Sequence, residues 1–181
     1  MKRMIVWLAA LALAVGLGLV VPGSASAAAP YCGIAWGSLP KSAPTVRAGT
    51  LEDVRAGQHE CFDRLVIDVQ GDAPGYVVEY GPVSTEGKGD PVPLRGAADL
   101  RIVVKAPAYD AHGHATYQPA DRAELVDVTG YGTFRQVAWA GTSEGQSTVG
   151  LGVRARLPFR VFVLDGPGNH SRVVVDVAHR W

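Results

Sequence analysis

The sequence predicts an all-β protein, an antiparallel β-sandwich of about nine strands with one disulfide. Short alternating or β-branched runs are separated by turn residues along most of the chain, which contains 22 Gly and 12 Pro. No segment has the sustained i, i+3, i+4, i+7 apolar spacing of an amphipathic helix. Strands that follow one another without helices between them favour a sandwich or a barrel over an α/β sheet.

The first 27 residues have the pattern of a secretory signal peptide. Lys2 and Arg3 precede an uncharged apolar run, Met4–Val21, and Ala25-Ser26-Ala27 is a small-x-small cleavage site. The alternative is a retained membrane anchor, because the run is near the lower length limit of a spanning helix. The cleavage pattern and the lack of a following charge cluster favour removal, which leaves no stable membrane span.

Charge excludes several partners. Without the leader, 15 Lys and Arg face 17 Asp and Glu, a net charge of −2. A nucleic-acid partner would require a strongly positive face, and a membrane-surface module a polybasic one.

The chain has no GxGxxG, P-loop or HExxH motif, so we expect no cofactor.

Both cysteines, Cys32 and Cys61, follow the leader. An even count in an exported protein predicts one disulfide. It would tie an irregular Pro/Gly/Ser-rich segment, residues 28–50, to a β domain over residues 51–181.

The strands are expected in order along that domain. Leu51–Arg55 fits either a short turn or a first strand. The alternating or β-branched runs that follow are Phe62–Val69, Tyr76–Tyr80, Leu100–Val104, Ala123–Val128, Phe134–Ala140, Ser147–Arg154, Phe159–Asp165 and Arg172–Val177.

Two of these strands repeat one pattern. Arg64–Val69 and Arg172–Val177 both read Arg-x-Val-x-Asp-Val or its close equivalent, with Arg and Asp on the face opposite an apolar stripe. The repeat indicates either two resembling halves of a sandwich or two ordinary strands with an exposed face. Nothing in the sequence places Asp68 beside Asp176 as a catalytic pair.

Gly141–Gly145 matches the GxSxG nucleophile elbow, with Asp165 and His170 following Ser143 in the order of a hydrolase triad. That elbow requires a helix after the serine, whereas a strand pattern follows here. A Gly-rich hairpin connection is the better interpretation.

Asp110, His112 and His114 form the best candidate for a metal site, since His-x-His can supply two imidazoles. No third convergent ligand is evident, so we expect no metal there. His59 and His179 have no assignable partner.

Exposed aromatic rings near arginines are a further candidate, because such surfaces bind glycans or peptides. The rings belong to Trp36, Trp139 and Trp181 and to the tyrosines; the neighbouring cations are Arg135, Arg154 and Arg156.

Five segments together resemble the AMIN-like domain of exported actinobacterial proteins: Tyr31–Ser38, Cys61–Asp68, Phe134–Gly141, Gly150–Asp165 and Ser171–His179. The resemblance implies a β-sandwich related to the AMIN domain, which directs envelope proteins to peptidoglycan. It supplies no catalytic residues, and the ligand-binding residues stay unknown. The absence of an attached amidase module departs from the usual AMIN arrangement.

We therefore expect an exported, non-enzymatic binding domain of the cell envelope, with peptidoglycan or another surface glycan as its ligand. Two alternatives stay open. One is a small secreted hydrolase using Ser143, Asp165 and His170, and the other is a protein adaptor that uses an open sheet edge.

Overall fold

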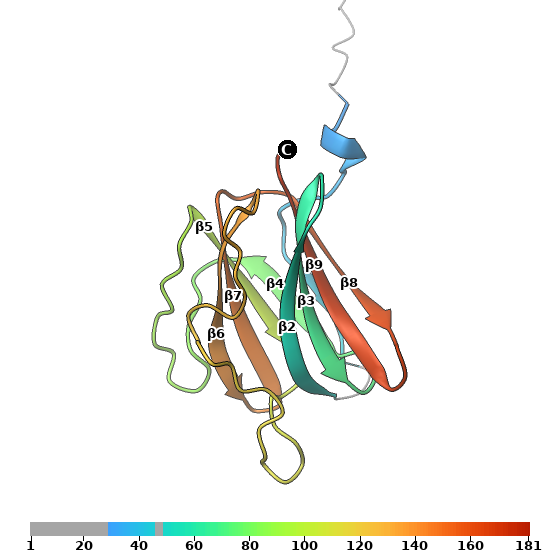
Figure 1. Ribbon diagram of the computed structural model, residues 1–181, viewed down its shortest axis with the longest axis vertical. Helices are drawn as coiled ribbons and strands as arrows, with labels where there is room; N and C mark the ends of the chain where they lie inside the picture. The colour runs from blue at the N-terminus through green and yellow to red at the C-terminus, as the bar shows by residue number, and fades with distance from the viewer. Residues whose placement is uncertain (1–28, 46–48) are drawn as a thin grey trace, which may run out of the picture.

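The computed structural model describes residues 29–45 and 49–181 and confirms the all-β prediction. Nine strands form two antiparallel sheets that pack face to face (Figure 1). Within the described ranges, the short 3-10 turn η1 (Tyr31–Gly33) is the one helical element. The predicted leader, residues 1–27, lies outside the described residues.

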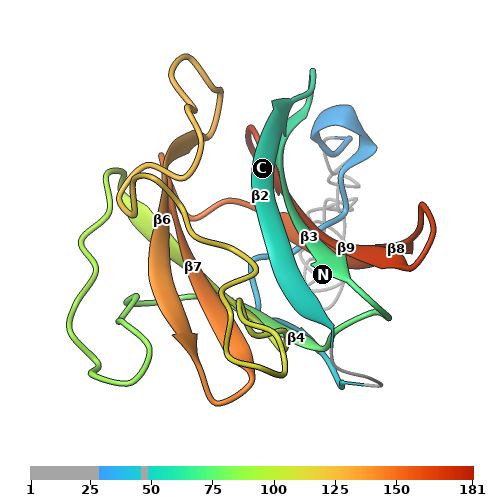
Figure 2. The same cartoon turned by 60° about the horizontal axis from the view of Figure 1, so that its bottom comes forward.

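Each sheet combines strands from distant parts of the chain, and Figure 2 shows the two layers from one end. The five-stranded sheet has the order β1-β4-β5-β7-β6 and the four-stranded sheet the order β2-β3-β9-β8. The strands are β1 (Lys41–Ala43), β2 (Thr50–Gln58), β3 (Phe62–Gln70), β4 (Tyr76–Tyr80), β5 (Ala98–Val104), β6 (Phe134–Ser143), β7 (Gln146–Val153), β8 (Phe159–Asp165) and β9 (His170–Ala178).

The core lies between the sheets and follows from the alternation along each strand. In β3, Leu65, Ile67 and Val69 are fully buried, while Arg64 and Asp68 point outward. The largest buried side chains come from both layers: Phe134, Phe159, Leu51, Leu65, Ile67, Leu100, Ile102 and Leu151. Their removal from water is the main stabilising term.

One predicted strand, Ala123–Val128, is wrong. The segment belongs to the long connection between β5 and β6. Side chains take the backbone groups of Ala123: Asp121 Oδ1 accepts from Ala123 N (2.8 Å), and Gln136 Nε2 donates to Ala123 O (2.9 Å). Leu125 N donates to Val137 O (2.8 Å) on β6, but the backbone bonds do not continue into a strand ladder there.

The N-terminal segment is less irregular than expected. Lys41–Ala43 forms β1, which pairs with β4, and Leu51–Arg55 is part of strand β2 rather than a turn. The Cys32–Cys61 disulfide is confirmed; it joins η1 to the residue before β3. The bridge therefore fixes the start of the described chain against the four-stranded sheet.

Candidate functional site

Ser143 of the GxSxG motif does not form a triad with Asp165 and His170. Ser143 ends β6, at one edge of the sandwich, whereas Asp165 and His170 flank the β8–β9 hairpin at the other edge (Figures 1 and 2). The His170 ring contacts Pro167 O (3.2 Å) and Glu52 Oε2 (3.3 Å) instead. A two-residue turn follows Ser143 and leads directly into β7, as the hairpin interpretation predicted.

The Asp110 motif braces its own loop. Asp110 Oδ1 accepts from the backbone amides of His112 (2.8 Å) and His114 (2.9 Å), and Oδ2 lies 3.1 Å from His114 Nδ1. The amide bonds, that to His114 first, lower the pKa of Asp110. No cluster of metal-ligating side chains occurs within residues 29–45 and 49–181.

The arginines proposed from the sequence serve the fold. Arg135 donates to the carbonyls of Tyr131 and Phe134, Arg154 to that of His179, and Arg156 to Ser38. These bonds hold the three guanidinium groups against neighbouring segments of the fold. Arg156 Cζ does lie 5.1 Å from the ring centroid of Tyr80, but a larger cluster of arginines and aromatic rings lies on the four-stranded sheet.

The repeated Arg and Asp pattern builds that surface. Its two copies are β3 and β9, the central strands of one sheet, and not equivalent strands in two halves of the sandwich. Because they run antiparallel, Arg64 lies opposite Asp176 and Asp68 lies opposite Arg172. All four side chains lie on the outer face of the four-stranded sheet.

Asp176 organises one end of this face. Its carboxylate is 0% exposed and accepts from Arg64 Nε (2.6 Å) and Nη2 (2.9 Å), and from Arg160 Nε (2.8 Å). The bond to Asp176 raises the pKa of Arg64. A buried carboxylate with two guanidinium partners holds both cations in fixed positions.

Aromatic rings lie beside these cations. Arg160 Cζ is 4.4 Å from the ring centroid of Trp36 and 5.1 Å from that of Phe162, and Arg64 Cζ is 5.3 Å from that of Phe62. Guanidinium groups over ring faces add cation–π attraction. The result is an outward surface of alternating cations and rings, which we call the arginine face.

A hollow of about 270 Å³ opens at the other end of the arginine face. Val66 and Val174 form its apolar floor, and the arginines of its walls are Arg55, Arg64 and Arg172. Arg55 is paired with Asp68 through Nε (2.6 Å) and Nη2 (3.0 Å). The hollow thus combines a hydrophobic base with cationic walls, the composition of many ligand sites.

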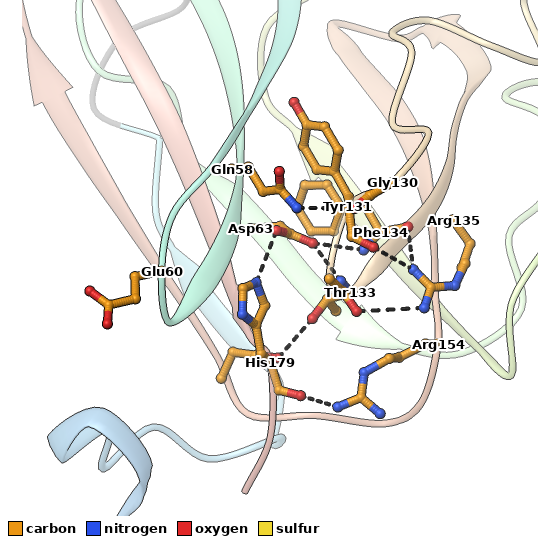
Figure 3. Close-up of polar contacts among 12 residues, drawn as sticks. Gln58, Glu60, Asp63, Gly130, Tyr131, Thr133, Phe134, Arg135, Arg154 and His179 are labelled. Atoms are coloured by element: carbon orange, nitrogen blue, oxygen red, sulfur yellow. Dashed lines mark hydrogen bonds and ion pairs between the residues drawn. The ribbon is translucent and has the colours of Figure 1, made fainter.

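A buried network supports the sheet beneath this face (Figure 3). Asp63, 0% exposed, accepts from Thr133 N (2.6 Å) and Phe134 N (3.0 Å), and its other oxygen lies 3.0 Å from His179 Nε2. Asp63 belongs to β3 and Phe134 to β6, so the carboxylate ties the two sheets together. Gly132 packs so closely that a Cβ there would lie 2.7 Å from His179 Nε2.

The sequence contained a signal for this network. Asp63 alternates with Leu65 and Ile67 on the inward stripe of β3, where a charged residue requires a buried partner. The alternation could have marked Asp63 as buried, but not His179 as its partner. The pairing depends on two strand ends far apart in the sequence.

A second hollow, of about 400 Å³, lies under the loop braced by Asp110. Tyr109, Tyr117 and Trp139 line it, with Tyr117 and Trp139 edge to face at 5.2 Å between ring centroids. Burial and the nearby Asp53 charge raise the pKa of Tyr117 to about 12. The phenol therefore stays neutral over the ordinary pH range.

Comparison with known proteins found one family. The model of the AMIN-like domain matches residues 49–179, well over half of the chain. No curated protein and no solved structure matches. No helix in residues 29–45 or 49–181 has the length and apolar character needed to cross a bilayer.

Proposed function

The chain belongs to the AMIN-like domain family, and from this premise we propose that it is a non-enzymatic binding domain that holds peptidoglycan on its arginine face. Domains of this family are peptidoglycan-related binding domains of the cell envelope.

The arginine face is the observation that supports peptidoglycan binding most strongly. Peptidoglycan is built from amino sugars and short peptides, and it presents apolar ring surfaces, amides and carboxylates. Aromatic rings such as Trp36 match the apolar surfaces, and arginines such as Arg160 donate to the carbonyl and carboxylate oxygens. Asp176 holds Arg64 and Arg160 in place before binding, which reduces the entropy lost on association.

A binding role also agrees with the positions of the nucleophile candidates. Ser143 is separated from Asp165 and His170 by the width of the sandwich, so neither residue can act as its general base. We further propose that residues 1–27 direct export and are removed. Residues 28–50 then form the N-terminal segment that the disulfide fastens to the domain of residues 51–181.

Sedimentation with purified cell-wall sacculi tests the proposal. We expect the protein to sediment with sacculi well above the level of an unrelated exported β protein. Arg160→Gln should lower the affinity about fivefold or more, as expected for an interface arginine. Arg101→Gln, on β5 of the other sheet, is the matched control and should bind normally. Sedimentation no better than the unrelated protein would refute the proposal.

A further inference from the structure

The arginine face has a local two-fold pattern, and the pattern is broken at one position. Antiparallel pairing places Arg64 opposite Asp176 and Arg172 opposite Asp68. The first pair forms a bidentate ion pair. The second does not form, because Asp68 binds Arg55 on the neighbouring strand through both of its oxygens.

Arg172 is consequently left without a carboxylate. No acidic side chain within the described part of the chain forms an ion pair with it, and Nη2 makes a single bond of 3.3 Å to Asp165 O. Its Nε is buried and has no hydrogen-bond partner. A buried unpaired donor costs free energy that an incoming acceptor would recover.

The neighbouring pairs show which acceptor fits this arrangement. Arg55 and Arg64 each present the Nε and Nη2 edge to the two oxygens of one carboxylate. Arg172, which lines the hollow floored by Val66 and Val174, has Nε unpaired and Nη2 held only by the 3.3 Å bond to Asp165 O. A guanidinium edge and a carboxylate match in geometry as well as in charge.

Access to that edge requires only side-chain movement. Leu164, the cross-strand neighbour of Arg172 on the edge strand β8, is 38% exposed. Arg172 is half-buried, so binding requires a rotamer change that turns Nε toward the hollow and gives up the Nη2 bond to Asp165 O. Arg55 and Arg64 also line the hollow, but each is paired with a carboxylate and adds little net positive charge.

We propose that this hollow is a carboxylate subsite, in which Arg172 binds a ligand carboxylate and the two valines contact a small aliphatic group attached to it. The inference rests on the proposed peptidoglycan binding and names the chemical group that the site recognises. The carboxylate belongs either to a peptide terminus or to a sugar acid.

Nuclear magnetic resonance of the arginine Nε–Hε groups tests the subsite. The probes are N-acetyl-alanyl-alanine, its C-terminal amide, and glucuronate, at equal ionic strength. We expect a saturable shift of the Arg172 resonance with at least one of the two acids, and none with the amide. The acid that binds more tightly identifies the source of the carboxylate.

Two variants complete the experiment. Arg172→Gln should weaken acid binding about tenfold or more, the effect of losing a charged hydrogen-bond donor. Arg101→Gln, whose parent arginine is paired with Glu79 on the other sheet, should leave it unchanged. If Arg172→Gln fails to fold, the comparison of acid and amide on the unaltered protein decides whether the hollow recognises a carboxylate.

The outcomes separate the two proposals. Equal shifts with acid and amide, or no Arg172 shift with either acid, overturn the carboxylate subsite. If sacculi still bind in that case, the proposed function stands without it. A specific acid shift in a protein that does not bind sacculi supports the subsite and overturns peptidoglycan as the ligand.

Discussion

Replacement of Asp176 by alanine should destabilise the protein far more than the same change at Asp68, although both occupy the same place in the repeated pattern. Asp176 is 0% exposed and binds two arginines. Asp68 is 23% exposed and binds Arg55, which is itself 51% exposed. Burial and the number of partners therefore distinguish the two carboxylates.

The expected loss of stability in Asp176→Ala depends on how much hydration the two unpaired arginines keep. Loss of one partner of a buried ion pair costs about 3–5 kcal/mol. Arg64 and Arg160 are 25% and 41% exposed and keep part of their hydration, so we expect the lower limit, about 3 kcal/mol, for Asp176→Ala. The exposed Arg55–Asp68 pair is worth about 1 kcal/mol or less.

Urea denaturation of the disulfide-intact protein measures the difference. With a slope of about 1.5 kcal/mol/M, Asp176→Ala should lower the midpoint by about 2 M, and Asp68→Ala by less than about 0.7 M. Equal losses of stability for the two variants, within about 0.5 kcal/mol, would refute the reasoning, because burial would then not decide the cost.

Three further predictions concern the rest of the fold. Asp63→Ala should lower the free energy of unfolding, measured in urea, by about 3 kcal/mol or more, because two buried amides and His179 lose their partner. A loss below about 1 kcal/mol would contradict the view that Asp63 ties the two sheets together. Replacing Cys32 and Cys61 together by serine should cost about 3–4 kcal/mol, the chain-entropy value for a bridge closing 29 residues, and an unchanged melting temperature would contradict it. The Tyr117 phenol should ionise near pH 12, so its contribution to stability is complete below about pH 10 and is lost as the pH rises through 12. Burial also raises the pKa of Tyr80, so Tyr117→Phe should reduce the late phenolate absorbance step without removing it, and an unchanged titration curve would contradict the assignment.

Local patterns predicted most of the strands and the disulfide, but they missed β1 and gave a false strand at Ala123–Val128. Alternation in Phe62–Gln70 and the β-branched run of His170–Ala178 identify both central strands. At Ala123–Val128, the Asp121 and Gln136 side chains take the backbone groups of Ala123, a competition that strand patterns do not report.

The candidate site could be predicted only in part. The sequence showed that Arg64 and Asp176 share one type of outward face, but their pairing depends on strand order. That β3 and β9 are neighbours is a non-local fact, decided by the packing of the whole sandwich. Strand order also explains why Asp68 pairs with Arg55 on β2 and leaves Arg172 without a carboxylate partner.

The central claim is that the arginine face holds peptidoglycan, and the binding of purified sacculi by matched arginine variants tests it most directly. We predict strong sedimentation of the unaltered protein and of Arg101→Gln, and about fivefold or greater loss of affinity for Arg160→Gln. Equal binding by all three proteins would show that peptidoglycan is held elsewhere, and no binding by any of them would contradict the proposed function.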